Sequence, residues 1–110
     1  MYKRQSSGCS SASAKPVAMS SESFRDFLSS VRKADFASEK LAIVRSATHR
    51  NYFTALQVKR TLRCFDMDSD RLKALEIMWP RVLDKENGFK ILDVFEFSDD
   101  KQKAAGIIEG

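Results

Sequence analysis

Three acidic side chains alternate along residues 66–70 (Asp-Met-Asp-Ser-Asp), a spacing that opens the calcium-binding loop of EF-hand proteins. That loop also needs a glycine at its sixth position, for a sharp turn, and a bidentate glutamate at its twelfth. The chain has Arg71 and Ile77 at these positions, so the set of oxygen ligands is incomplete. We therefore interpret the acids as the first turn of a helix, where the positive end of the helix dipole stabilises negative charge.

The other residues that could perform catalysis are few and scattered. His49 is the only histidine, which excludes most nucleophile triads and multi-histidine metal sites. The acidic pairs Asp84/Glu86 and Asp99/Asp100 have no nucleophile or base beside them, and the four glycines form no phosphate-binding loop. The sequence thus predicts a protein that is not an enzyme and that uses no metal or cofactor.

A weaker copy of the central pattern occurs on either side of it. Phe36, Met67 and Phe97 are 31 and 30 residues apart, and small polar, acidic and basic residues follow each of them. Each copy also supplies a serine that is favourable as a helix N-cap: Ser38, Ser69 and Ser98. A period of about 30 residues with one capped helix per copy is typical of stacked helical hairpins. The predicted fold is all-α, with about six short helices arranged as three αα-hairpins in a right-handed superhelix.

Local signals place several helix ends. Thr54 and Gln57 have the spacing of a capping box, which predicts the start of the third helix. Pro80 lacks an amide hydrogen and disfavours helical geometry at Trp79, so the fourth helix should end or kink there. The remaining predicted helices begin near residue 21, span residues 38–49, follow Gly88 and span residues 98–110.

The core should form where apolar residues recur with helical spacing. Phe24, Phe27, Leu28 and Val31 follow the pattern i, i+3, i+4, i+7 of an amphipathic helix. The other residues expected to face the interior are Leu41, Val44, Ala47, Ala55, Val58, Leu62, Cys64, Phe65, Leu72, Leu75 and Met78. Cys64 is read as a small buried apolar residue, because no second cysteine has a spacing typical of zinc ligands or of a disulfide partner.

Residues 1–20 differ in composition from the rest of the chain. They are rich in serine and alanine and hold too few apolar residues to offset the entropy of ordering, so we expect a disordered tail before a domain over residues 21–110. Residues 1–5 resemble a translated sequencing adaptor, which predicts a metagenomic gene fragment without its natural N-terminus. Residues 7–10 resemble a lipoprotein cleavage site, but a plain linker is preferred because no apolar segment precedes them. The sequence leaves the compartment open between cytoplasm and export, and no apolar run has the length of a membrane span.

Several segments of the chain resemble a known helical domain family of unknown function. The resemblance covers residues 24–108 and depends on residues 36–41, 53–58, 65–72 and 91–97, with Phe-Thr-x-x-Gln-Val and Arg-Leu-Lys-Ala as the most specific pieces. The family it resembles occurs in bacteroidete proteins and at the N-terminus of vertebrate proline- and serine-rich proteins. The resemblance implies a helical fold and no catalytic residues. Gln102 departs from the pattern, since the other two copies have leucine there.

The two halves of the predicted domain differ in charge. Residues 21–63 hold nine basic and four acidic side chains, and residues 64–110 hold seven basic and eleven acidic ones. Such a difference also arises by chance, because the charges on solvent-exposed helix faces are often unequal in number. If it is functional, a basic patch for an anionic partner should form from Arg45, Arg50, Lys59, Arg60 and Arg63. Nucleic acid is a less favoured partner, because only Tyr52 and Phe53 near the patch are able to stack on bases.

We expect a non-enzymatic helical module that binds another protein or a peptide. The last helix carries Ile107 and Ile108 on a side that no further predicted repeat covers, so an apolar strip should be exposed at the third hairpin. Asp99, Asp100 and Lys103 should rim this strip and complete the partner site. The charge difference favours a basic partner there, or the basic half of a second copy in weak self-association. The alternative function is the binding of an anion or a nucleic acid, which added salt would weaken steeply.

Overall fold

A computed structural model describes residues 17–109 of the chain, and the fold is all-α as predicted. This part of the chain forms five α-helices and two 3-10 helices. In chain order they are α1 (Ser21–Lys33), α2 (Ala37–Arg50), α3 (Ala55–Leu62), α4 (Asp68–Met78), η1 (Trp79–Arg81), η2 (Lys85–Val94) and α5 (Ser98–Glu109). No helix within residues 17–109 combines the length and the apolar character that crossing a membrane requires.

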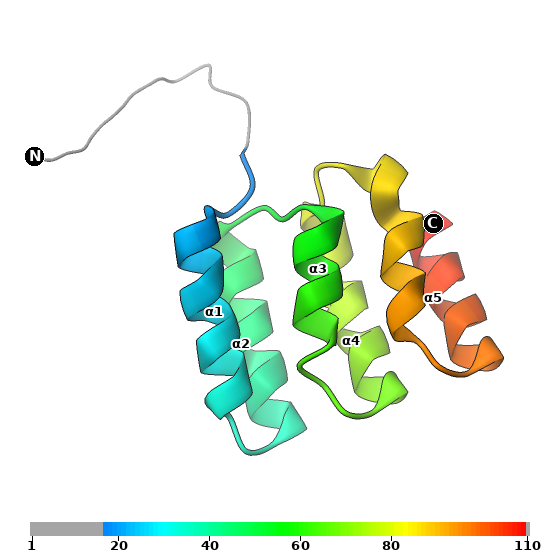
Figure 1. Cartoon of the computed structure of the whole chain (residues 1–110), viewed down its shortest axis with the longest axis horizontal. Coiled ribbons are helices and arrows are strands. Elements are labelled where there is room, and N and C mark those ends of the chain that lie inside the picture. The colour runs from blue at the N-terminus through cyan, green and yellow to red at the C-terminus, as the bar shows by residue number, and fades with distance from the viewer. Residues whose placement is uncertain (1–16, 110) are drawn as a thin grey trace, which may run out of the picture.

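The helices pack as three pairs in two layers (Figure 1). Within the pairs, α1 contacts α2, α3 contacts α4, and η2 contacts α5. Along the first layer α1, α3 and η2 are neighbours, and along the second layer α2, α4 and α5 are neighbours. The arrangement as αα-hairpins and the right-handed superhelical sense stay predictions.

The two long edges of this array differ. One, which we call the loop edge, holds the turns within the helix pairs: residues 34–36, 63–67 and 95–97 (lower side of Figure 1). The opposite linker edge holds residues 17–20, 51–54 and 79–84. At the linker edge the main chain is paired across segments: the Met19 N–H donates to Tyr52 O (2.8 Å), and the Leu83 N–H donates to Phe53 O (3.0 Å).

Residues from both layers form one apolar core. The largest side chains with almost no exposure are Phe53, Phe65, Leu62, Leu75, Met78, Ile91, Val31, Val44 and Val58. The predicted burial is confirmed at three residues on the inward face of α3 and at Phe65 after that helix, as it is at Leu75 and Met78 in α4. Leu41, Ala47 and Leu72 are only half-buried, because they pack against the margin of the core rather than inside it.

The predicted helix ends are partly confirmed. Both hydrogen bonds of the Thr54/Gln57 capping box are present, each 3.1 Å long. The last α-helical residue before Pro80 is Met78, and the short helix η1 follows directly. η2 begins at Lys85, earlier than predicted, and is a 3-10 helix.

The prediction that serines cap the second helix of each pair is wrong. α2 and α4 begin one residue before Ser38 and Ser69, and the N-cap residues are Phe36 and Met67, which make no side-chain cap hydrogen bond. Ser98 is itself the first residue of α5. In α4 the earlier start places the Asp68 carboxylate where the Arg71 guanidinium and the Glu96 N–H group bind it.

The ordered fold begins before the predicted boundary at residue 21. Ala18 forms a parallel bridge with Tyr52, and the Gln57 side-chain amide donates to Met19 O at 2.7 Å. Residues 18 and 19 therefore belong to the packed array. The predicted disorder of residues 1–16, and with it the interpretation of residues 1–5 and 7–10, lies outside the described residues.

Candidate functional site

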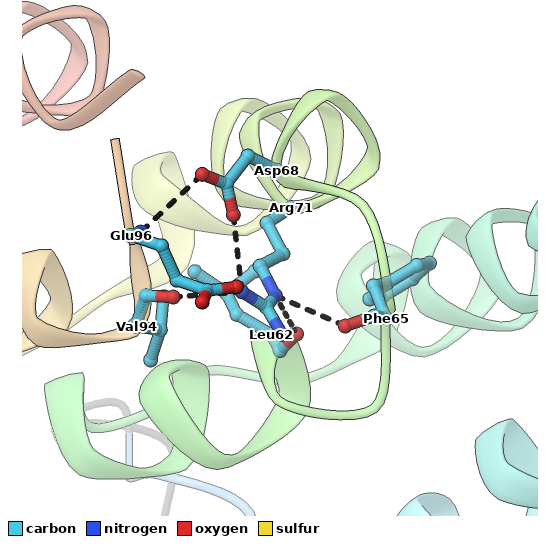
Figure 2. A network of polar contacts seen from close by, with 6 residues as sticks. All are labelled: Leu62, Phe65, Asp68, Arg71, Val94 and Glu96. Carbon is cyan, nitrogen blue, oxygen red and sulfur yellow. Dashed lines mark hydrogen bonds and ion pairs between the residues drawn. The ribbon is translucent and has the colours of Figure 1, made fainter. Parts of the chain in front are cut away.

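Arg71 of α4 is the centre of a cluster of polar contacts (Figure 2). Arg71 Nε donates to Leu62 O (3.2 Å) and Phe65 O (3.0 Å), while its Nη1 donates to Val94 O (2.8 Å) and pairs with Asp68 Oδ1 (3.0 Å). The side chains of Arg71 and Asp68 are 14% and 7% exposed. The guanidinium thereby ties α4 to the C-terminal ends of both α3 and η2, where carbonyl groups without helical partners favour a positive charge.

Asp68 is held from two sides within the same cluster. Its Oδ2 accepts a 3.3 Å hydrogen bond from the Glu96 N–H, across the turn that leads into α5. Protein groups thus engage both carboxylate oxygens of Asp68 and the Nε and Nη1 groups of Arg71. We assign the cluster a structural role.

Lys40 occupies the position in α2 that Arg71 occupies in α4. Its Nζ donates to Cys64 O at 2.7 Å, next to the C-terminal end of α3. Burial raises the pKa of the Cys64 thiol, and the nearby positive charges of Arg32 and Lys40 only partly oppose this. The thiol therefore stays protonated at neutral pH, which agrees with its interpretation as an apolar residue rather than a nucleophile.

The acids that imitate a calcium loop do not converge. Asp68 points into the arginine cluster, whereas Asp66 and Asp70 line a shallow hollow at the loop edge together with Asp35. Within residues 17–109 no group of three His, Cys, Asp or Glu side chains is arranged to hold a metal ion.

The five basic residues predicted to form an anion-binding patch lie in separate places. Arg45 and Arg50 line a hollow on α2, in the second layer. Lys59 pairs with Asp93 of η2 (3.4 Å), whereas Arg60, the next residue, lines a groove on the other side of α3, towards α1. Arg63 is exposed beyond the end of α3. Arg45 and Arg50 therefore share one hollow, whereas Arg60 lines a different one.

The predicted apolar strip of the third helix pair is partly covered. Ile107 and Ile108 are half-buried and pack against the core. Ile107 lines a hollow of about 420 Å³ with Trp79, Pro80 and Lys85. The residues expected to rim the strip, Asp99, Asp100 and Lys103, lie along α5 and are exposed or half-exposed. The use of this surface by a partner stays a prediction.

A groove between α1 and α3 is the site that sequence reasoning missed. It measures about 470 Å³ and is lined by Ser21, Phe24, Arg25, Leu28, Thr54, Leu56, Gln57 and Arg60. Its floor is apolar, since Phe24 and Leu28 are buried, and Leu56 stands at its lip with 51% of its surface exposed. Because most of the lining residues lie in the first halves of α1 and α3 or directly before α3, the groove lies towards the linker edge.

Two charged side chains line this groove. Arg25 and Arg60 are both exposed and face it from α1 and α3. Thr54 and Gln57 already use their side chains in the capping box, so the two arginines are the charged groups available to a ligand. The only sequence signal was that Leu56 falls outside the inward pattern of α3, at Ala55, Val58 and Leu62.

The described residues form a small all-α domain with a groove between α1 and α3. A family model described as a domain of unknown function (DUF4476) matches residues 18–108, and the chain belongs to that family. The match begins at Ala18, where the contacts of the packed array also begin. No curated protein and no solved structure matches the chain.

Proposed function

We propose that the domain is a non-enzymatic module that binds a peptide segment of another protein in the groove between α1 and α3. The observation that carries the proposal is the combination of an apolar floor with two arginines in one hollow of about 470 Å³. Binding sites of this kind are mostly apolar and use a few polar groups to orient the ligand. The expected ligand is a short segment with a bulky apolar side chain and a carboxylate, which a guanidinium binds with two parallel hydrogen bonds.

Selection from random peptides tests this proposal. A displayed library of 12-residue peptides would be selected on the wild-type domain, and the recovered peptides would be titrated against variants by calorimetry. We expect recovered peptides to pair apolar residues with Asp or Glu. Leu56→Glu and Arg60→Glu should each weaken their binding at least tenfold, since each places a negative charge in the groove.

A matched control separates the groove from general surface effects. Leu83 is also an exposed leucine, in the linker between η1 and η2, and it does not line the groove. Leu83→Glu should leave the affinity of the recovered peptides unchanged. If the recovered peptides bind Leu56→Glu and Arg60→Glu as tightly as wild type, the groove is not the binding site.

The alternative of anion or nucleic-acid binding receives less support. The five basic residues expected to cooperate are distributed over α2, both sides of α3 and the turn after it. A phosphate-driven complex would lose affinity steeply between low and physiological salt, whereas a peptide held by an apolar floor would lose little. Titration of a single-stranded oligonucleotide at two salt concentrations distinguishes the two functions.

A further inference from the structure

Three large apolar side chains protrude from the loop edge at equivalent positions of the three helix pairs. Phe36, Met67 and Phe97 are 68%, 61% and 66% exposed. The carbonyl group of each accepts a hydrogen bond from a main-chain N–H group in the first turn of the following helix. The donors are the N–H groups of Lys40 (3.0 Å), Arg71 (3.0 Å) and Lys101 (2.9 Å) respectively. Since the three turns lie side by side along one edge (Figure 1), these residues form what we call the apolar row.

Local stability does not account for the apolar row. The residue at the start of a helix is most favourable as Ser, Thr, Asp or Asn, whose side chain accepts a hydrogen bond from a free N–H group. Phe36 and Met67 make no such bond, and their exposed side chains gain nothing from burial. Phe36 and Met67 are therefore unfavourable in the isolated domain for two reasons, and Phe97 for its exposure. One shared use of the edge explains all three positions together.

Acidic side chains accompany the apolar row. The residues that directly precede its members are Asp35, Asp66 and Glu96, and all three are exposed. A hollow of about 160 Å³ between the first two turns brings Asp35 and Asp66 together with Asp70 and Met67. The apolar row and the acids thus share one surface.

The basic residues at this edge are fewer or already engaged. Lys40 and Arg71 bind carbonyl groups at the ends of neighbouring helices. Arg32 and Lys33, at the end of α1, offset the charge of Asp35 in the turn between α1 and α2. Only Arg63 and Lys101 remain beside the second and third turns, against Asp66, Asp70, Glu96, Asp99 and Asp100. The acidic excess therefore increases from the first turn towards the third.

The spacing of the row selects the conformation of a partner. Packed helices lie about 8–10 Å apart, so neighbouring members of the row repeat at about that distance. A polyproline II segment advances about 3.1 Å per residue with three residues per turn, so every third side chain shares a face and recurs after about 9 Å. We propose that the loop edge binds a basic segment of another protein in this extended conformation, with an apolar side chain at every third residue and basic residues between them.

A designed peptide tests the proposal. The probe is the nonapeptide (Lys-Pro-Leu)₃ with a fluorescent label, and binding is followed by fluorescence anisotropy. We expect saturable binding, at least tenfold weaker binding of (Glu-Pro-Leu)₃, and comparable weakening when one residue is added to each triplet so that leucine recurs at every fourth position. Absence of saturable binding by (Lys-Pro-Leu)₃, or equal binding of the glutamate peptide, would overturn the proposal.

Substitution of the row separates function from folding. The triple variant Phe36→Ser, Met67→Ser, Phe97→Ser should bind (Lys-Pro-Leu)₃ at least tenfold more weakly and yet melt at a higher temperature than wild type, because serine is the better N-cap residue. Leu56→Glu, in the α1–α3 groove, should bind the probe like wild type. If the triple variant binds the probe with wild-type affinity, the row is not the site. If sedimentation shows a wild-type dimer that the triple variant abolishes, a second copy occupies the edge and the proposal is wrong.

Discussion

The two junctions between the helix pairs use the same position of the chain in different ways. At the first junction, Lys40 of α2 reaches Cys64 O with a single 2.7 Å hydrogen bond. At the second, Arg71 of α4 reaches Val94 O and also binds two carbonyl groups of its own pair and the Asp68 carboxylate. A lysine supplies one compact charge, whereas the planar guanidinium has a fork of donors that satisfies several acceptors at once. The comparison indicates that the second junction depends far more on its basic residue than the first.

Removing the arginine should produce the largest effect. Arg71→Ala leaves Asp68 as a nearly buried carboxylate without its charged partner and removes the donor of the Phe65 and Val94 carbonyl groups. Breaking a buried ion pair in this way costs about 3–5 kcal/mol. Urea unfolding followed by circular dichroism measures the loss. The double variant Arg71→Ala, Asp68→Ala should recover part of it, and a loss of less than about 1 kcal/mol would show that the cluster is not essential to the junction.

A substitution that keeps the positive charge at position 71 but removes the planar guanidinium should have an intermediate effect. Arg71→Lys retains a cation for Asp68. The guanidinium reaches the Phe65 and Val94 carbonyl groups with two different nitrogen atoms, whereas lysine has a single ammonium nitrogen and cannot reach both. We expect a loss of about 1.5–3 kcal/mol, the range for hydrogen bonds that involve a charged group. The same urea experiment measures it. A stability equal to that of wild type would mean that charge alone holds the second junction.

The first junction should be less sensitive. Lys40→Ala removes one hydrogen bond from a half-buried position, and water is able to solvate part of the vacated Cys64 carbonyl group. The expected loss is about 0.5–1.5 kcal/mol. Lys40→Arg is the reverse substitution to Arg71→Lys and serves as its control. It should change stability little, because the first junction has no buried carboxylate that a guanidinium would pair with. A loss at Lys40→Ala as large as that at Arg71→Ala would contradict the difference between the junctions.

The third equivalent position should show the smallest effect. Lys101 of α5 is exposed, and the described part of the chain places no further helix end beside it. Lys101→Ala should leave the midpoint of thermal unfolding unchanged. A clear decrease would mean that this lysine makes a contact that the comparison of the three positions does not include.

The sequence predicted those features that depend on local chemistry or on periodic burial. The capping box at Thr54 and Gln57, the helix end before Pro80 and the inward face of α3 all follow from patterns within a few residues. The arginine cluster does not, because its acceptors are main-chain carbonyl groups. Every residue has a carbonyl group, so nothing in the sequence indicates that Arg71 binds the one at Val94.

Dependence on tertiary structure also explains the wrong serine N-caps at the loop edge and the groove that was not predicted. Phe36, Met67 and Phe97 served to align the three copies, and the structure places all of them in solvent. The serine N-caps were predicted from local sequence alone, whereas α4 begins one residue earlier, at Asp68, whose carboxylate makes tertiary contacts. The α1–α3 groove depends on how two helices that start 34 residues apart in the chain are spaced in the first layer, which no local pattern encodes.

The pairing of the main chain at the linker edge has a consequence for cooperativity. Stacked helical arrays often melt in stages, because each unit contacts only its neighbours through side chains. Here Met19, Phe53 and Leu83 join successive pairs by main-chain hydrogen bonds at one edge, while Lys40 and Arg71 join them at the other. A pair that unfolded alone would have to release its neighbour at both edges together. The domain should therefore melt in a single transition, with the calorimetric enthalpy equal to the van't Hoff enthalpy.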